Sequence, residues 1–296
     1  MFNNTVKVNN IYHGDCLELM KDIPDKSIDM ILADLPWLYG TTNCRWDTVI
    51  DLDKLWLQYG RIIKDNGAIL LFAQPPFDKV LAVSNLKLFR YEWIWDKSQP
   101  TGHLNAKRMP LKRHENILVF YKKFPTYNPQ MTTGDKRKKV SSKARRECEE
   151  RNWESDSIYQ KGNLDLINDY DSTVRYPVDI IKLSKDTQTS SMHPTQKPVE
   201  LGRYLIRTYT NKGDVVLDNT SGSGSFLVSA VLEGRNFIGM EKNEDTKLFK
   251  KQDIDYIELS KKRVLDAYSV TKYKEYLEKE NLFREDQWQK KVEQII

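Results

Sequence analysis

The chain has 296 residues, of which 39% are hydrophobic and 30% are charged, and its formal net charge is +5 at pH 7. This length suits one large α/β domain with a smaller inserted or appended region. No apolar run approaches the roughly 20 residues that a membrane-spanning helix needs, and residues 1–10 are polar, unlike a signal peptide. The three cysteines (Cys16, Cys44 and Cys148) lack metal-site spacing, and the four histidines are scattered. We therefore expect a cytoplasmic protein with no membrane partner and no metal site.

Short apolar runs alternate with helical patterns up to about residue 122, which predicts a parallel sheet with crossover helices. The first expected strand is short and includes residues 11–12. The next four cover 28–33, 68–72, 91–95 and 116–121. The expected helices cover 16–21 and 52–64, and the second closes at Asn66-Gly67, a pair that favours a helix end. Trp93 and Trp95 are expected in the core.

The pattern decays between about 123 and 192, where the chain is polar and basic. A stretch this long exceeds an ordinary connection in a compact domain, so it is either a small separate module or a partly mobile region. Regular patterns then return. We expect helices over 198–208 and 226–233, strands over 215–217 and 237–239, and two final helices over 254–268 and 273–295.

A glycine-rich turn (Asp-Asn-Thr-Ser-Gly-Ser-Gly-Ser, 218–225) follows the strand at 215–217. A carboxylate at a strand end, followed by such a turn and a helix, is typical of a site for a nucleotide-like ligand. A plain tight turn is the alternative. Glu241 ends the next strand a little over 20 residues after Asp218, a spacing that suits a carboxylate bonded to ribose hydroxyls. Together the two acids predict an adenosine-type cofactor, and no lysine follows Gly224 as in a phosphate-binding loop.

The tetrapeptide Asp34-Leu35-Pro36-Trp37 stands at the end of the strand over 28–33. Pro36 fixes the backbone, so its carbonyl and the Asp34 carboxylate can point into one pocket as two acceptors for an amino group. Trp37 offers a flat face on which a base could stack. Taken alone, the tetrapeptide is better interpreted as a strand-ending turn with a core tryptophan.

These two motifs resemble those of the amino-methylating DNA methyltransferases, whose catalytic signature is Asp-Pro-Pro-Tyr or a close variant. Residues 193–198 (His-Pro-Thr-Gln-Lys-Pro) are similar to a further motif of that family, and so are Gly14-Asp15, Trp95-Asp96-Lys97 and His114-Glu115-Asn116. The resemblance covers roughly 11–122 and 192–263. It implies S-adenosylmethionine as the cofactor and an α/β, Rossmann-like fold with a seven-stranded mixed sheet and helices on both faces.

The catalytic motif precedes the cofactor loop, which matches the circularly permuted arrangement called the β class of this family. In that arrangement the strand ending at Glu241 can lie beside the strand of Tyr12 and close one sheet across the chain ends. We therefore expect four segments. The resemblance implies a catalytic half (1–123) and a cofactor-binding half (192–268), and the segment between them (124–191) falls where the family keeps its target-recognition module. The helical pattern at the end of the chain adds a C-terminal arm (269–296).

The candidate site residues form three groups. The catalytic group comprises Asp34, Pro36 and Trp37. The cofactor-binding group comprises Asp15, Cys16, Asp34, Lys197, Asp218, Thr220, Gly222, Ser223, Gly224 and Glu241. The DNA-binding group comprises Tyr39 and a basic run that can attract a phosphate backbone: Lys136, Arg137, Lys138, Lys139, Lys143, Arg145 and Arg146. Alternatives stay open for Asp15 as a helix N-cap, for Lys197 as a surface lysine, and for the basic run as a solvated loop.

Two features depart from the family pattern. Two extra residues stand in the segment Trp37-Leu38-Tyr39-Gly40-Thr41, so that either Trp37 or Tyr39 could stack on the target base, and we prefer Trp37. About ten residues (245–254) are inserted after Glu241 and could alter the rim of the adenine pocket.

The motifs together predict a site-specific methyltransferase that methylates adenine N6 of a base flipped out of double-stranded DNA. Adenine is favoured because Asp34 stands where amino-cytosine (N4) enzymes often have serine. That N4 activity is the first alternative. A nicotinamide oxidoreductase would not explain 34–37, and a non-catalytic DNA-binding protein on a decayed fold would not explain two intact motifs. A homodimer and a cognate restriction endonuclease are further candidate partners, and a bacterial or phage-encoded, nucleoid-associated protein is expected.

Overall fold

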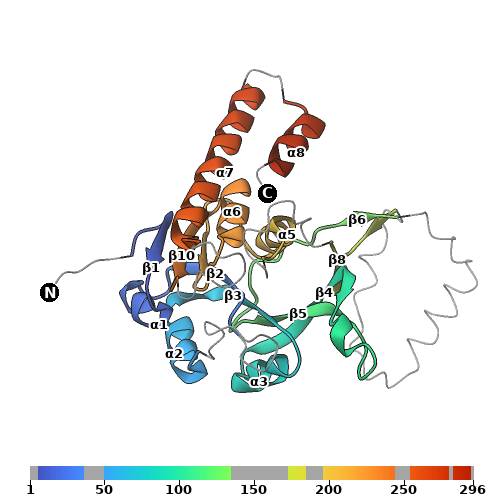
Figure 1. Ribbon diagram of the computed structural model, residues 1–296. Coiled ribbons are helices and arrows are strands. Elements are labelled where there is room, and N and C mark those ends of the chain that lie inside the picture. Colours follow the sequence, from blue (N-terminus) through green and yellow to red (C-terminus); the bar gives the residue numbers. More distant parts are fainter. Residues whose placement is uncertain are drawn as a thin grey trace, which may run out of the picture. The chain divides into compact units, whose positions relative to one another are not determined.

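The computed structural model describes residues 6–36, 50–134, 173–184, 196–243, 254–279 and 283–294 (Figure 1). Its strands are β1 Asn10–His13, β2 Ile28–Ala33, β3 Ile63–Ala73, β4 Phe89–Thr101, β5 Lys112–Phe120, β6 Thr132–Thr133, β7 Val174–Arg175, β8 Ile180–Lys182, β9 Val215–Asp218 and β10 Asn236–Glu241. Its helices are α1 Cys16–Leu19, α2 Leu52–Ile62, α3 Phe77–Ser84, α5 Val199–Tyr209, α6 Ser225–Leu232, α7 Tyr256–Lys279 and α8 Glu285–Glu293, with short 3-10 helices η1 Met20–Asp22 and η2 His103–Asn105.

Eight strands form one mixed sheet in the order β1-β10-β9-β2-β3-β5-β4-β8. β5 is antiparallel to β3 and β4, and every other neighbouring pair is parallel. Seven of these strands are those that the sequence predicts, and β8 adds an eighth at the edge beside β4. β1 pairs with β10 so that Tyr12 lies beside Met240 and His13 beside Glu241. The expected closure of the sheet across the two ends of the chain is therefore confirmed.

The sheet separates two apolar layers. Apart from Asp29, β2 consists of apolar residues that are buried on both faces, as inner parallel strands require. Leu32 belongs to the layer that contains α5, α6 and α7, whereas Ile31 belongs to the layer that contains α1, α2 and α3. The helices therefore cover both faces of the sheet (Figure 1). Trp93 and Trp95 are buried in the first layer, as predicted.

The expected end of the second helix is wrong. α2 ends at Ile62, and Ile63 already has extended backbone angles and begins β3. Gly67 therefore lies inside a strand and caps no helix. It is needed there for space, because a Cβ at this position would lie 2.7 Å from Ile63 Cδ1 and 2.8 Å from the Asp29 carbonyl oxygen.

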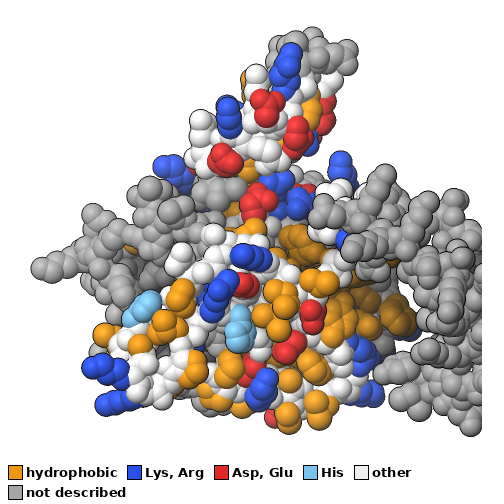
Figure 2. All heavy atoms as spheres, turned by 90° about the vertical axis from the view of Figure 1, so that its right-hand side faces the viewer, with side chains coloured by type: hydrophobic (Ala, Val, Ile, Leu, Met, Phe, Trp, Pro, Cys, Tyr) orange, Lys and Arg blue, Asp and Glu red, His pale blue; other side chains and the backbone are white. Residues whose placement is uncertain are grey.

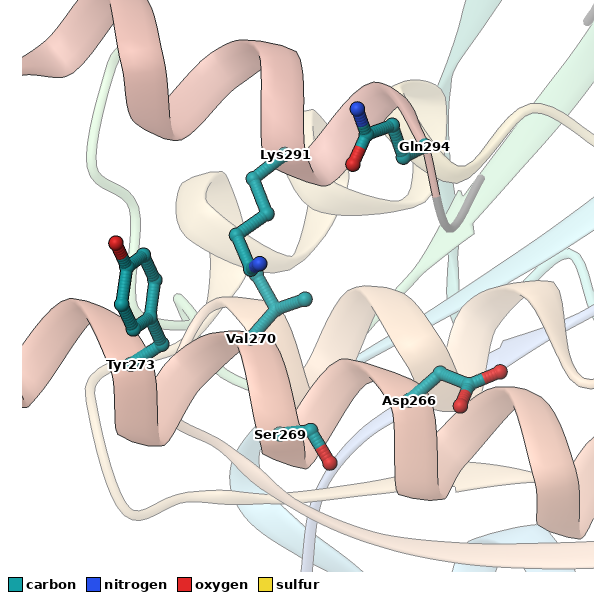
Figure 3. Close-up of a pocket in the computed structure, with 6 residues that line it drawn as sticks. All are labelled: Asp266, Ser269, Val270, Tyr273, Lys291 and Gln294. Atoms are coloured by element: carbon teal, nitrogen blue, oxygen red, sulfur yellow. The ribbon is translucent and has the colours of Figure 1, made fainter.

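The expected break between the two last helices is also misplaced. α7 runs without interruption over 256–279, because neither glycine nor proline occurs within it. The proposed segment boundary at 268/269 therefore falls inside a helix. α8 follows, and a pocket between α7 and α8 is lined by Asp266, Ser269, Val270, Tyr273, Lys291 and Gln294 (Figure 3).

The chain divides into two compact units, one containing 1–128 with 179–296 and the other containing 129–178. In the smaller unit the described residues include an antiparallel pair, β6 with β7. This unit is narrower than the expected module at 124–191. At its C-terminal end the unit is shorter because β8 pairs with β4 and so belongs to the main sheet. At its N-terminal end it is shorter because Asn128 Nδ2 donates hydrogen bonds to the carbonyls of Arg207 (3.1 Å) and Thr210 (3.0 Å). No helix within the described ranges is long and apolar enough to cross a membrane.

Candidate active site

Three acidic residues stand at the carboxyl ends of neighbouring parallel strands. Asp34 follows β2, Asp218 ends β9 and Glu241 ends β10, and these strands lie side by side in the sheet. Carboxyl ends of parallel strands meet at one edge, which is where open α/β sheets bind ligands. The topology therefore brings together acids that are far apart in the sequence, and the candidate site is at this edge.

The glycine-rich turn connects two of these acids. The Thr220 amide donates to Asp218 Oδ1 (3.2 Å), and the Gly222 amide donates to Glu241 Oε2 (2.7 Å). Gly222 has φ 48°, and a Cβ there would meet nothing within 4 Å, so the turn is open on that side. Gly224 has φ 79°, and its Cβ would lie 2.7 Å from Ser260 on α7, so glycine is required there for both conformation and space.

Asp218 is a buried carboxyl group in an acidic environment. Burial raises its pKa well above the ordinary value of 3.8, and the negative charges of Glu241 and Asp34 raise it further, while the bond from the Thr220 amide works against them. Such a carboxyl group is destabilised in its ionised form. A cationic ligand placed beside it would relieve that cost, so the site favours a ligand with a positive charge.

Asp34 is held from two sides. Thr220 Oγ1 donates to the Asp34 backbone carbonyl (3.1 Å), which joins the tetrapeptide to the glycine-rich turn. Lys197 Nζ donates to Asp34 Oδ2 at 2.5 Å. The Asp34 side chain is 23% exposed and Pro36 is half-buried. A charge-assisted bond of this kind is among the stronger hydrogen bonds in proteins, so it fixes the orientation of the carboxylate.

Lys197, a candidate for the cofactor-binding group, lies against two carboxylates. Its ammonium group contacts Asp34 and, at 3.3 Å, Glu115 Oε2. Burial would lower the pKa of Lys197, but the charges of Asp34 and Glu115 outweigh it and raise that pKa. Lys197 is buried, so its interpretation as a surface lysine is wrong.

Asp15 and Cys16 begin α1 beside the end of β10. The Gly14 amide donates to the Glu241 carbonyl (2.9 Å), and Asp15 Oδ1 accepts from the Leu17 amide (2.8 Å), so Asp15 is the helix N-cap. Cys16 is buried, and burial raises the pKa of its thiol. An N-cap role leaves the second carboxylate oxygen of Asp15 available for other contacts, so both interpretations of this residue are compatible.

Ser223 links the turn to α7 and to the segment before α5. Its hydroxyl donates to Gln196 Oε1 (3.2 Å), and its carbonyl accepts from Arg263 Nη1 (2.6 Å). Gln196 belongs to the motif at 193–198 but was not among the candidate site residues, and sequence reasoning did not single out Arg263. It also missed Tyr59, whose hydroxyl donates to Asn219 Oδ1 at 2.6 Å.

Several predicted residues lie outside the described ranges. These are Trp37, Tyr39, Lys136, Arg137, Lys138, Lys139, Lys143, Arg145 and Arg146. The insertion expected over 245–254 also lies outside them except for its last residue. The described residues bring together Asp34, Lys197, Thr220, Asp218, Gly222 and Glu241.

Residues 28–252 match a family model described as DNA methylase, with activity at N6 and N4 amino groups. The chain belongs to this family. The Type II methyltransferase M2.MboI of Moraxella bovis is 25% identical over 287 residues, which cover 89% of this chain and 90% of the relative. The DNA adenine methyltransferase YhdJ of Escherichia coli (strain K12) is 29% identical over 264 residues, or 82% of this chain and 81% of that one.

Solved structures of methyltransferases share the fold. The M1.HpyAVI–SAM complex superposes with a TM-score of 0.55 at 22% identity and covers 86% of this chain and 98% of its own. The PvuII DNA methyltransferase (cytosine-N4-specific) has a TM-score of 0.55 at 14% identity and covers 90% and 93%. The expected Rossmann-like methyltransferase fold is therefore confirmed, and the protein is a DNA methyltransferase that acts on amino groups.

Proposed function

We propose that this chain methylates adenine N6 of a base flipped out of double-stranded DNA. The observation that carries the proposal is the placement of Asp34, a carboxylate at the edge of the sheet that is bonded through its backbone to the cofactor turn and through its side chain to Lys197. A carboxylate accepts hydrogen bonds from an amino group more strongly than a hydroxyl does. The relative from Escherichia coli is named an adenine enzyme, which supports the same base.

S-adenosylmethionine is the cofactor. Its sulfonium group supplies an electrophilic methyl group. The chemistry of the site fits this ligand, because Asp218 and Glu241 offer carboxylates to a cationic amine and to ribose hydroxyls, and the turn is open at Gly222. We propose that Asp218, Thr220, Gly222, Ser223, Gly224 and Glu241, together with Asp15 and Cys16, hold it.

Asp34 and the Pro36 carbonyl then act on the target base. Both accept hydrogen bonds from the amino group, and a bond to the charged carboxylate is worth about 1.5–3 kcal/mol. These bonds orient the nitrogen lone pair out of the ring plane, and the Asp34 charge stabilises positive charge that develops on the amino group. Trp37, or else Tyr39, would stack on the flipped base. No covalent intermediate with the protein is required.

DNA is the substrate of this family, and we propose that the basic run at 136–146 contacts its phosphates. On the face that Figure 2 shows, basic and acidic side chains of the described residues are mixed among apolar ones. A mixed surface of this kind attracts DNA less than a run of one sign does. The single sign of the run supports it as an electrostatic contact with DNA. A homodimer and a cognate endonuclease remain proposals that no observation on the described residues favours.

The test of the proposed base is the chemical identity of the product. DNA is incubated with the protein and S-adenosylmethionine, digested to nucleosides and analysed by mass spectrometry. We expect N6-methyladenine. N4-methylcytosine as the main product would move the activity to the other amino group while keeping the fold and the cofactor. No methylated nucleoside with DNA of varied sequence would favour the decayed, non-catalytic alternative.

A further inference from the structure

Four charged side chains form a line of alternating sign that ends on Asp34. Lys97 Nζ lies 3.3 Å from Glu115 Oε1, and Glu115 Oε2 lies 3.3 Å from Lys197 Nζ. Lys197 in turn donates to Asp34 Oδ2. Lys97 comes from β4, Glu115 from β5, and the other two from the segments before α5 and after β2. The fold therefore assembles this line from four separate parts of the chain.

Lys97 occupies a position where an apolar side chain is expected. It follows Trp93 and Trp95 at alternate positions of β4, and only 1% of its side chain is exposed. Burying an ammonium group is costly unless it is paired. A buried ion pair adds little to the stability of the fold. Apolar residues of similar volume in its place often give a protein that is equally stable. Fold stability alone therefore gives no reason for a lysine and a glutamate here.

The backbone of β4 bends next to Lys97. Its register with β5 shifts between Asp96 and Thr101, and such irregularities redirect side chains. Ser98 has φ 63°, in the left-handed region that non-glycine residues rarely adopt. Its amide donates to Asp96 Oδ1 (2.9 Å), and Arg113 holds both Asp96 oxygens (2.8 and 2.9 Å). Strained backbone that is held in place by surrounding hydrogen bonds is typical of functional sites.

The line is balanced in charge, with two ammonium groups and two carboxylates. Burial would raise the pKa of Glu115, but the positive charges of Lys197 and Lys97 outweigh it and lower that pKa. Each Glu115 oxygen faces a different lysine. Lys197 is therefore held between two carboxylates and is not held by Asp34 alone, and its position depends on Glu115.

We propose that Glu115 and Lys97 are positioning residues for methyl transfer: Glu115 fixes the Lys197 ammonium group against Asp34 Oδ2, and Lys97 fixes Glu115. Without Glu115, the Lys197 ammonium group is attracted by Asp34 alone. Lys197 can then pull the Asp34 carboxylate away from the position in which it accepts from the target amino group. This inference rests on the proposed role of Asp34 as the acceptor for the target amino group. A displacement of about 1 Å in a catalytic group can lower a rate by about 100-fold.

The test compares Glu115→Gln with the double variant Lys97→Met/Glu115→Gln. The double variant removes one charge of each sign, so it leaves no extra buried charge and should fold. For both we expect the single-turnover rate constant of methyl transfer to fall about 100-fold, with the Kd for S-adenosylmethionine close to that of the parent. Glu115→Asp keeps the charge and should recover part of the rate. If the double variant does not fold, the Gln and Asp variants of Glu115 decide the question.

Glu233→Gln is the matched control. Glu233 also lies between two cations, with 10% of its side chain exposed, and it accepts from Arg203 Nε (2.6 Å) and Arg207 Nη1 (2.8 Å). It lies at the far end of α6 from the glycine-rich turn. We expect this variant to lose thermal stability and to keep the parent rate constant. A similar loss of rate in Glu233→Gln would mean that any buried ion pair has this effect, and would overturn the proposal.

A second readout does not depend on activity. In protein labelled with ¹⁵N-lysine, the NMR signal of the Lys197 ammonium group, assigned with Lys197→Arg, should be protected from exchange in the parent and lost in both Glu115→Gln proteins. A parent-like signal or a parent-like rate in those variants would contradict the proposal. If the parent transfers no methyl group to DNA, the proposed function fails, while the NMR signal still shows whether Glu115 fixes Lys197.

Discussion

The hydroxyl of Thr220 donates a 3.1 Å hydrogen bond to the backbone carbonyl of Asp34. This bond joins the turn that we assign to the cofactor with the residue that we assign to the target base. Because the two segments are far apart in the sequence, we expect this bond to help fix the distance between the two ligands.

Replacing Thr220 with valine should therefore slow methyl transfer without removing the cofactor site. The loss of one hydrogen bond, about 1 kcal/mol, corresponds to a roughly fivefold fall in rate. Single-turnover kinetics at saturating S-adenosylmethionine measures it, and Thr220→Ser, which keeps the hydroxyl, is the control. Equal rate constants for the valine and serine variants would show that the bond has no catalytic role.

Asp218→Asn should weaken cofactor binding and stabilise the fold above pH 4. The pKa of Asp218 in the folded protein is raised above its ordinary value of 3.8, so the folded state binds a proton more tightly than the unfolded state does. Between those two pKa values, stability declines as pH rises, and the deficit persists at higher pH. Asparagine does not ionise and avoids this loss.

The measurement for Asp218 is thermal unfolding over pH 4–9 together with calorimetry of S-adenosylmethionine binding. We expect the Tm of Asp218→Asn to exceed that of the parent at pH 8 and to approach it near pH 4. The affinity should fall strongly. A variant that is less stable than the parent at pH 8, or one with unchanged affinity, would contradict the assigned burial and role of this carboxyl group.

The sequence predicted those parts of the fold that depend on local patterns and on motif order. The mainly apolar segment 28–33 is β2 as expected, and the order of the motifs placed Tyr12 beside the strand of Glu241. Both features follow from periodicity or topology. Parallel strands of one sheet end at one edge, so the grouping of Asp34, Asp218 and Glu241 could be predicted as well.

The rest depended on contacts between distant residues. β8 is a strand because its three residues pair with β4, and the polar segment around them gives no local signal. Gly67 suits a helix end, but the close approach of Ile63 and Asp29 needs it inside β3. The partners of Lys197 come from the segment after β2 and from β5, so the sequence could not reveal that its ammonium group contacts Asp34 and Glu115.

The packing of α5 against α6 provides a test of the fold itself. A Cβ at Gly202 would meet Ser229 Oγ and would lie 2.9 Å from Phe226 Cδ1, so Gly202→Ala should destabilise the protein by about 1–3 kcal/mol. Gly60, in the last turn of α2, is exposed and has nothing within 4 Å. Gly60→Ala should stabilise by roughly 0.5–1 kcal/mol. Urea unfolding of both variants measures these changes in the free energy of unfolding. If both substitutions change it in the same direction, the close contact between α5 and α6 at Gly202 is contradicted.

The proposed DNA contact predicts a change in salt dependence. Replacing Lys136, Arg137, Lys138 and Lys139 with alanine should weaken DNA binding and reduce the slope of log K against log salt by about one for each phosphate that the protein no longer neutralises. Cofactor affinity should stay the same. A control that removes the same amount of charge replaces four exposed lysines with alanine: Lys21, Lys54, Lys122 and Lys261. If both quadruple variants have the same slope, the run at 136–139 is only a solvated segment.

In the proposed mechanism the Asp34 side chain acts on the target amino group, and the cofactor site does not depend on it. The most direct measurement is transfer of a labelled methyl group from S-adenosylmethionine to DNA by the parent and by Asp34→Ala, with the cofactor Kd of each determined by calorimetry. We predict that the parent labels DNA, and that the variant loses this activity while its Kd for S-adenosylmethionine stays close to that of the parent. An Asp34→Ala protein that still methylates DNA at the parent rate would contradict this role of Asp34.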